Sequence, residues 1–282
     1  MHTGHACSII NLEKVLKYEK VSSNIFRNTD IKGGIAISYR DVSKNFGAIE
    51  TFTDHEELNS ILNRIKGMAI TPVSEVAYVT AKFNFDRLLV DVPRCTALLK
   101  ERRLATNVLD ILDNIVFFAK QPNDQQEYVH VYGRIGNSRA YRWIRRDYID
   151  LPNNIDKYKV FLPKVSGNGS FGETFPDPVI GVPGEINTHT FMSIGALETE
   201  REGDALLKYV KTKFARAMLG ILKITQHNSN ECWKYVPLQD FSSASDIDWS
   251  VSIADIDCQL YKKYNLTEAE IAFIETHVKE MA

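Results

Sequence analysis

An amphipathic pattern over residues 202–226 constrains the fold of this chain more than any other feature. At about 100° per residue its apolar side chains share one face. They are Leu206, Leu207, Val210, Phe214, Ala217, Met218, Ile221 and Ile224. The basic residues of the segment fall on the opposite arc and are Lys208, Lys213, Arg216 and Lys223. The pattern predicts one long helix whose basic edge is either a solvated surface or part of a polyanion-binding face.

Composition limits what such a face can bind. The chain has 282 residues, of which 44% are hydrophobic, so it can bury a sizeable core in one large or two small domains. Its net charge of -2 argues against a uniformly basic nucleic-acid coat. Any binding to DNA must therefore come from a segregated basic patch.

The cysteines and the hydropathy bear on location and on metals. Cys7, Cys95, Cys232 and Cys258 contain no C-x-x-C pair, so neither a zinc site nor a disulfide framework is expected. His55, His130, His189 and His277 have no zinc-ligand spacing either, and core or surface roles are expected for them. No apolar run approaches the length of a membrane span, and we expect a cytoplasmic protein.

The first third of the chain predicts strands, then a helix. Two strand-like runs over 15–21 and 35–39 flank a segment with Gly33 and Gly34, whose turn chemistry predicts a hairpin-like pair. Residues 53–66 predict an amphipathic helix, and a soft domain boundary follows near residue 70. Residues 73–92 are rich in β-forming residues, and 98–119 could hold one helix.

A basic and aromatic run covers residues 128–148. Alternation predicts two short strands around a turn over 133–138 that presents Arg134 and Arg139. Arg142, Arg145 and Arg146 follow, interleaved with tyrosines and Trp143. Arginines with aromatic neighbours can grip phosphates and stack on bases. The alternative is a solvated strand face whose arginines pair with local acids, and the composition leaves both open.

A glycine-rich loop precedes the long helix. Gly167, Gly169 and Gly172 fit G-x-G-x-x-G loosely, but no helix opens after them, so a dinucleotide cofactor is not expected there. Thr188 and Thr190 lie on a predicted strand with outward hydroxyls.

The C-terminal residues 231–282 carry ten acids against four lysines, which makes them a poor DNA surface. They predict helices over 253–264 and 267–281, and Thr267 and Glu270 have the spacing of a capping box. We expect this part to serve packing or contact with a partner.

Segments that recur in order give the chain a family resemblance. They are IKGGIAISYRD (31–41), KVFLPKVSGNGSFGE (159–173), PGEINTHTFMSIG (183–195), YVKTKFARAMLGILKITQ (209–226), YVPLQDF (235–241) and DIDCQLYKKYNLTEAEIAFIETHVKEM (255–281). Together they resemble the C-terminal half of bacterial type II restriction-modification N6-adenine DNA methyltransferases, of the kind fused to a target-recognition domain and often to a nuclease. The resemblance implies an α+β fold. Residues 1–70 would be a remnant of the methyltransferase sheet, and 71–282 a mixed β/α DNA-recognition domain with a long amphipathic helix and a helical C-terminus.

The chain departs from this family at its catalytic motifs. Neither the Asn-Pro-Pro-Tyr tetrapeptide that clamps the flipped adenine nor the glycine-rich S-adenosylmethionine loop is present. A metal-dependent nuclease motif is incomplete as well, because Asp177 and Glu185 are not followed by the required lysine. We therefore expect a fragment, a split subunit or a truncated product that is not active alone. S-adenosylmethionine is expected only in a complete enzyme.

The leading hypothesis is a sequence-specific double-stranded DNA recognition module. Its predicted contact residues are Arg134, Arg139, Arg142, Lys164, Asn168, Ser170, Thr188, Thr190, Lys213 and Arg216. Lys164, Lys213 and Arg216 are assigned to phosphates and the loop residues to bases. The hypothesis requires a positive strip joining the 134–146 run to the 208–223 helix. Two alternatives remain: a subunit catalytic only with a methyltransferase or nuclease chain, and a protein-interaction module without DNA contact.

Overall fold

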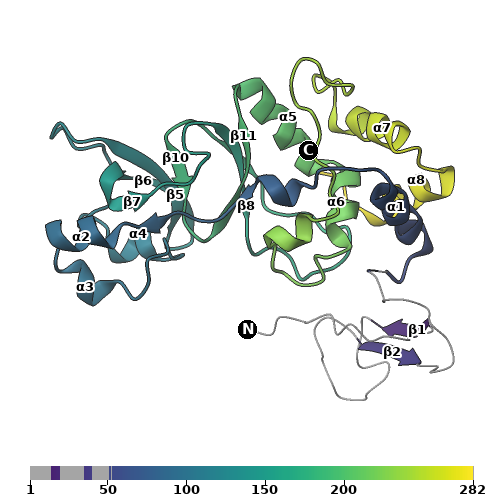
Figure 1. Ribbon diagram of the computed structural model, residues 1–282, viewed down its shortest axis with the longest axis horizontal. Coiled ribbons are helices and arrows are strands. Elements are labelled where there is room, and N and C mark those ends of the chain that lie inside the picture. Colours follow the sequence, from purple (N-terminus) through teal and green to yellow (C-terminus); the bar gives the residue numbers. More distant parts are fainter. Residues whose placement is uncertain (1–13, 20–34, 40–50, 52, 282) are drawn as a thin grey trace. The chain divides into compact units, whose positions relative to one another are not determined.

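The residues that the computed structural model describes are 14–19, 35–39, 51 and 53–281. Within them the chain is mixed α+β, with several separate sheets and eight α-helices (Figure 1). The expected fold class is confirmed at this coarse level. The chain forms two compact units, residues 1–61 and 62–282. The second unit holds every described sheet except one strand pair.

That strand pair belongs to the first unit. β1 (Lys14–Glu19) pairs antiparallel with β2 (Ile35–Tyr39), which confirms the predicted pair. The predicted turn residues Gly33 and Gly34 lie outside the described residues. The predicted helix is also confirmed as α1 (Glu56–Gly67), which begins with two glutamates where the helix dipole favours negative charge.

A long β-hairpin forms most of the three-stranded sheet in the second unit. β5 (Tyr128–Ile135) and β6 (Ser138–Arg145) pair residue for residue across the turn Gly136-Asn137. Gly136 has a φ of +55°, the left-handed conformation that a tight hairpin turn needs. β10 (Glu185–Asn187) adds a parallel strand beside β5. The predicted hairpin is confirmed, with longer strands and a shorter turn than expected.

A four-stranded sheet of order β3-β11-β8-β9 forms the second β layer. Its antiparallel strands are β3 (Ala77–Tyr78), β8 (Tyr158–Pro163), β9 (Val179–Gly181) and β11 (Phe191–Leu197). A separate two-stranded ladder joins β4 (Lys82–Phe83) to β7 (Ile149–Asp150). Tyr132 of the hairpin stacks on Phe161 of β8 with ring centroids 5.6 Å apart. The hairpin and the four-stranded sheet therefore share packed side chains.

Three short helices lie beside the hairpin (Figure 1). They are α2 (Phe85–Asp91), α3 (Cys95–Leu98) and α4 (Val108–Ile111). Their apolar residues pack with Val129, Val131 and Ile144 from the inner face of the hairpin. Residues 73–92 contain the short strands β3 and β4 but also α2, and residues 98–119 contain one helix of four residues, α4, so both predictions hold in part. Short turns that each send one or two apolar side chains into a core leave no clear periodicity in sequence.

The long helix predicted over 202–226 is two helices. α5 (Glu200–Lys211) ends and α6 (Lys213–Gly220) begins at Thr212, whose ψ of 149° is not helical. The Thr212 hydroxyl donates to Tyr209 O and accepts from Ala215 N, so one side chain serves both helix ends. The apolar face is nevertheless buried over most of its length, and α5 packs against β8 and β11 (Figure 1).

Two helices complete the C-terminal part. α7 (Ile253–Lys263) and α8 (Glu268–His277) confirm the predicted pair, although α8 ends earlier than expected. The capping box between Thr267 and Glu270 is confirmed, since each side chain accepts a backbone N–H of the other residue. Short 3-10 turns occur at Val73–Val76, Arg146–Tyr148 and Asn230–Trp233.

Candidate functional site

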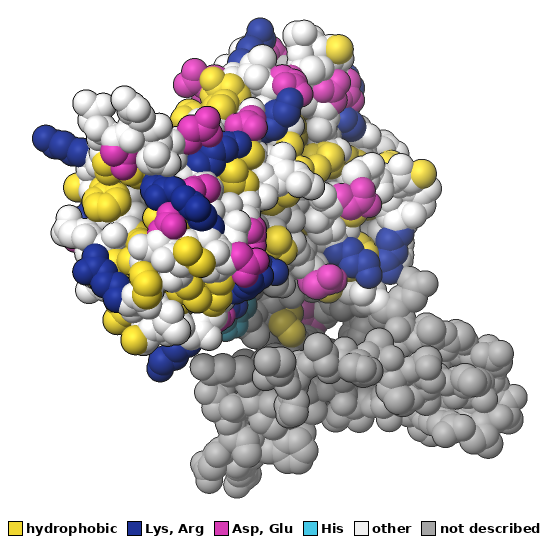
Figure 2. Space-filling view, turned by 60° about the vertical axis from the view of Figure 1, so that its left-hand side comes forward, with side chains coloured by type: hydrophobic (Ala, Val, Ile, Leu, Met, Phe, Trp, Pro, Cys, Tyr) yellow, Lys and Arg dark blue, Asp and Glu magenta, His cyan; other side chains and the backbone are white. Residues whose placement is uncertain are grey.

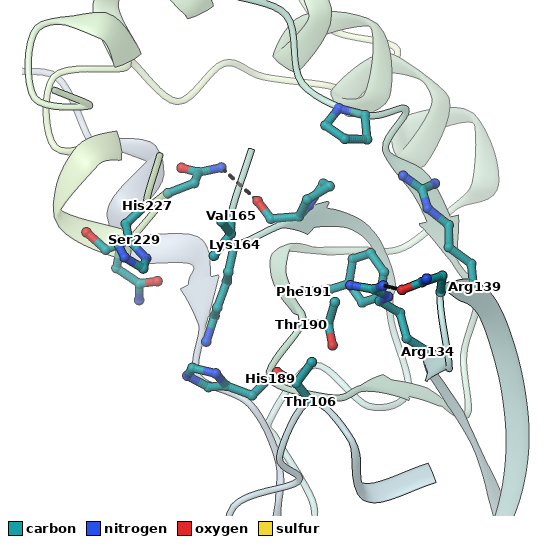
Figure 3. Close-up of a pocket in the computed structure, with 15 residues that line it drawn as sticks. Thr106, Arg134, Arg139, Lys164, Val165, His189, Thr190, Phe191, His227 and Ser229 are labelled. Atoms are coloured by element: carbon teal, nitrogen blue, oxygen red, sulfur yellow. Dashed lines mark hydrogen bonds between the residues drawn. The ribbon is translucent and has the colours of Figure 1, made fainter. Parts of the chain in front are cut away.

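A pocket of about 870 Å³ opens where the tip of the β5–β6 hairpin meets the end of β8 and the start of β11 (Figure 3). Its basic and imidazole side chains are those of Arg134, Arg139, Lys164, His189 and His227. Its hydroxyl and amide groups come from Thr106, Asn137, Thr190, Asn228, Ser229 and Asn230. None of the described residues that line it is an aspartate or a glutamate, and Pro163, Val165, Pro176 and Phe191 add apolar surface. The cations of the lining therefore favour an anionic ligand.

Two arginines of the hairpin tip face this pocket. Arg134 donates to the side chain of Asn137 at 2.9 Å. Arg139 donates to the backbone carbonyl of Asp177 at 2.7 Å and lies over the Phe191 ring, 5.8 Å from its centroid. Neither guanidinium pairs with a carboxylate in the described part of the chain. No described carboxylate therefore offsets the two positive charges at the rim of the pocket.

The remaining arginines of the same hairpin are neutralised. Arg142 binds Asp113 at 2.9 Å, and Arg145 binds Asp147 and Asp91. Arg146 lies 3.7 Å from Glu127. On the face drawn in Figure 2, basic side chains are likewise interspersed with acidic ones and do not form a continuous strip. Arg142, one of the predicted DNA contacts, thus has Asp113 as a partner for its guanidinium.

Lys164 anchors the opposite side of the pocket. Its backbone N–H donates to Thr190 O at 3.0 Å and its carbonyl accepts from Asn228 N at 2.8 Å. The main chain of this residue thus ties the start of β11 to the segment after α6. The half-buried ammonium donates to Thr80 Oγ1 at 3.2 Å and pairs with no carboxylate among the described residues. Burial, with a smaller contribution from the charge of Arg103, lowers the pKa of Lys164.

His189 lies next to Lys164 in the pocket (Figure 3). Its Nε2 is 3.2 Å from Nη1 of Arg103, which also binds Glu101 at 3.0 Å. Because a guanidinium can only donate, Nε2 is the acceptor and the imidazole is neutral. Burial and the charges of Lys164 and Arg103 lower the pKa of His189, against a smaller opposing effect of Glu101.

The segment after α6 forms a wall of the pocket that the sequence analysis did not identify. Asn228 is buried, donates to Pro163 O and accepts from the Trp233 indole at 2.8 Å. Asn230 donates to Ala77 O at 2.8 Å. These two amides hold the wall in place, while His227 and Ser229 are exposed beside them. The polar run His-Asn-Ser-Asn over 227–230 was the available signal.

The glycine-rich loop does not reach the pocket. Two of its backbone amides, of Asn168 and Gly169, donate to the Glu173 carboxylate, which also binds Lys223. The Asn168 side chain accepts from the backbone and hydroxyl of Ser170. The chain's own carboxylate thus occupies the amides that a phosphate would use. Asn168 and Ser170, which the sequence predicts as base contacts, are not among the residues that line this pocket.

The predicted basic edge of the helix is used for packing. Lys213 pairs with Glu275, and Lys208 donates to backbone carbonyls at 249–251. Arg216 is only 3% exposed and donates to the carbonyls of Lys211, Glu173 and Lys279. Burial lowers the pKa of Arg216 to about 10. Arg216 is therefore buried and Lys213 is ion-paired, so both residues make contacts within the chain.

The two predicted threonines have different environments. Thr190 lines the pocket, whereas Thr188 is fully buried and its hydroxyl donates to that of Thr190 at 3.2 Å. Thr188 packs so closely on Gly133 that a Cβ there would lie 2.7 Å from its methyl group. Thr188 therefore supports Thr190 from within the core and has no exposed hydroxyl of its own.

The aromatic side chains of the hairpin stack on one another. His130 lies between Tyr141 and Trp143, with ring centroids 4.5 and 4.3 Å away. Tyr132 continues the stack to Phe191 at 4.4 Å. Burial, followed by the nearby charge of Glu185, raises the pKa of Tyr141 well above its ordinary value. These rings stiffen the hairpin beneath its tip, and Phe191 is the one of them that lines the pocket.

The described residues form neither a metal-ligand cluster nor a membrane-spanning helix. No group of three or more His, Cys, Asp or Glu side chains could hold a metal ion in the described part of the chain. Cys95 and Cys232 are buried, Cys258 is exposed, and all three are free thiols. Across the described ranges, no helix has both the length and the apolar character to cross a bilayer.

Two sequence comparisons assign the chain to no family. The chain matches no protein-family model, and no curated protein matches it in sequence.

Proposed function

We propose that residues 62–282 bind double-stranded DNA through the pocket at the hairpin tip. One observation carries the proposal. Arg142, Arg145 and Arg146, on β6 and directly after it, are neutralised by carboxylates, whereas Arg134 and Arg139 have no carboxylate partner among the described residues and face a pocket whose described lining contains no acid. Uncompensated cations around a concave surface attract a polyanion, and the phosphate backbone supplies most of the affinity in such complexes.

The pocket residues fall into two chemical groups. Arg134, Arg139 and Lys164 are the cations able to neutralise phosphates. Thr190 and Ser229 carry hydroxyl groups that can donate to or accept from base edges. This set replaces the larger one expected from the sequence, from which Arg142, Asn168, Ser170, Thr188, Lys213 and Arg216 are now omitted.

The finer assignment rests on the family resemblance. In it, residues 1–70 are the last strands of a methyltransferase-like sheet and 71–282 are the recognition domain of a cytoplasmic restriction-modification adenine methyltransferase. Methyl transfer would then need S-adenosylmethionine and an adenine clamp supplied outside this chain. A methyltransferase or nuclease chain is the partner that this assignment implies.

The test measures binding of a mixed-sequence DNA duplex by fluorescence anisotropy over a series of salt concentrations. A triple variant, R134A/R139A/K164A, removes the three pocket cations. The matched control, K157A/K213A/K263A, removes the same charge from lysines that pair with Glu198, Glu275 and Asp246. Each lost phosphate contact lowers the slope of log K against log salt by about 0.9.

We expect the pocket variant to lose about two to three such contacts and the control to keep the wild-type slope. Equal loss in both variants would show that general charge, and not the pocket, attracts DNA. Absence of wild-type binding at low salt would overturn the proposed function altogether.

A further inference from the structure

We propose that the part of the pocket lined by Lys164 and His189, with Arg103 hydrogen-bonded to His189, is a phosphate-binding subsite that takes up a proton on His189 when a phosphate group enters. This inference rests on the proposed function, because the phosphate it describes belongs first to the DNA backbone. Free inorganic phosphate offers the same chemistry, and the two arms of the experiment distinguish it from the phosphate of the DNA backbone.

The ammonium of Lys164 has capacity that the described residues do not use. It carries three N–H donors, and its described partner is the neutral Thr80 hydroxyl at 3.2 Å. The residue lines the pocket and its side chain extends toward the His189 ring (Figure 3). A half-buried ammonium with unused donors and no carboxylate partner is stabilised strongly by an anion that reaches it.

Arg103 and His189 supply the other donors. Nη1 of Arg103 donates a hydrogen bond to the lone pair of His189 Nε2, 3.2 Å away. A phosphate oxygen can replace that lone pair as the acceptor. Protonation of Nε2 then turns the imidazole from an acceptor into a donor directed at the same oxygen or its neighbour. The step is balanced: solvent supplies one proton to Nε2, and no covalent bond to phosphorus changes.

The charges around His189 explain why its protonation depends on a bound anion. The groups around His189 are Lys164 and Arg103, with Glu101 bound to Arg103 and His227 across the pocket. Glu101 offsets one of the two fixed positive charges, so without an anion a protonated imidazole faces an excess of positive charge. A phosphate group reverses that balance, and the charged imidazole becomes favourable.

The experiment follows both the anion and the proton. One arm measures the affinity of the mixed-sequence duplex between about pH 5.5 and 8, a range centred near the ordinary histidine pKa. The other arm follows the His189 ring resonances by NMR as inorganic phosphate is added. The variants are H189Q, which keeps hydrogen-bonding capacity but cannot take up a proton, and the control H277Q, which replaces a histidine of α8 that is not among the residues lining the pocket.

We expect the duplex affinity of the wild type and of H277Q to rise as the pH falls, by up to about tenfold per pH unit for one linked proton. H189Q should show a flatter dependence, and inorganic phosphate should raise the pKa of His189. If H189Q keeps the wild-type pH dependence and phosphate leaves the His189 resonances unchanged, the subsite is refuted even where DNA still binds. If phosphate raises the pKa of His189 but the duplex does not bind, the subsite stands for free phosphate and the DNA-binding proposal fails.

Discussion

Arg134 and Arg139 stand directly opposite each other across the β5–β6 hairpin, two like charges in one cross-strand pair. Facing like charges destabilise an antiparallel pair. Asp113, Asp147 and Glu127 neutralise the arginines farther along the chain. Among the described residues, no carboxylate pairs with Arg134 or Arg139. The arrangement is costly for the hairpin by itself and favourable once an anion occupies the pocket.

The first prediction concerns this conflict between stability and binding. R134Q removes one of the facing charges, so we expect its free energy of unfolding at low salt to equal or exceed that of the wild type by up to about 0.5 kcal/mol. Its DNA affinity should fall. The control R142Q breaks the ion pair with Asp113 and should lower stability by up to about 1 kcal/mol. Urea unfolding at two salt concentrations tests both, and a clear destabilisation by R134Q would contradict the argument.

The second prediction concerns the glycine-rich loop. Gly172 has a φ of +70°, and a Cβ there would lie 2.1 Å from the backbone carbonyl of His277. G172A should cost about 3 kcal/mol or more, because a backbone atom of α8 must move. Gly136 has a similar φ of +55° but open space around it, so G136A should cost only about 1–2 kcal/mol. Equal losses in chemical denaturation would mean that the loop moves easily away from α8.

The third prediction concerns the carboxylate that the loop encloses. Burial alone would raise the pKa of Glu173, but its bonds to Lys223 and to the amides of Asn168 and Gly169 outweigh it, and the net pKa is lowered. Stability from Glu173 is therefore present above the pKa of the unfolded chain and is lost as the pH falls through the folded pKa. E173Q leaves Lys223 buried without its partner and should cost about 3–5 kcal/mol near neutral pH.

Unfolding of E173Q and the wild type at pH values from about 3 to 7 tests this, and the difference should shrink toward low pH. The control E198Q breaks the exposed pair with Lys157 and should change stability by less than about 1 kcal/mol. A pH-independent difference for E173Q would show that hydrogen bonding, and not charge, is what the loop requires.

The fourth prediction concerns Asp257, whose carboxylate accepts the backbone N–H groups of Lys213 and Phe214 at the start of α6. Burial is the main cause that raises the pKa of Asp257 to about 6. The sign is opposite to that for Glu173: the stability contribution is full below the unfolded pKa near 4 and is lost as the pH rises through 6. The loss is on the order of 2–3 kcal/mol.

D257N removes this titration while it keeps one acceptor for the helix amides. The stability of the wild type relative to D257N should therefore decrease from pH 4 to 6 and then level off, as measured by thermal or urea unfolding. D204N, on the exposed side of α5, provides the control and should show no such slope. An increase of the relative stability with pH would contradict the raised pKa.

Local patterns determined several elements from the sequence alone. Alternating residues predicted the β5–β6 hairpin, and the Thr267 and Glu270 spacing predicted the start of α8, because both signals depend only on near neighbours in the chain. The same reasoning placed Arg134 and Arg139 near a turn. The mixed α+β class, which the family resemblance implies, is confirmed at a coarse level.

The tertiary structure decided which charges are free. Lys213 and Arg142 looked as available as Arg139, but their partners Glu275 and Asp113 are distant in sequence and reach them only after folding. The break at Thr212 likewise interrupts a helical pattern that continues through it, because one hydroxyl caps two helices. Periodicity reports which face of a segment is apolar, whereas the charge of a surface depends on long-range contacts, so the pocket could emerge only from the folded chain.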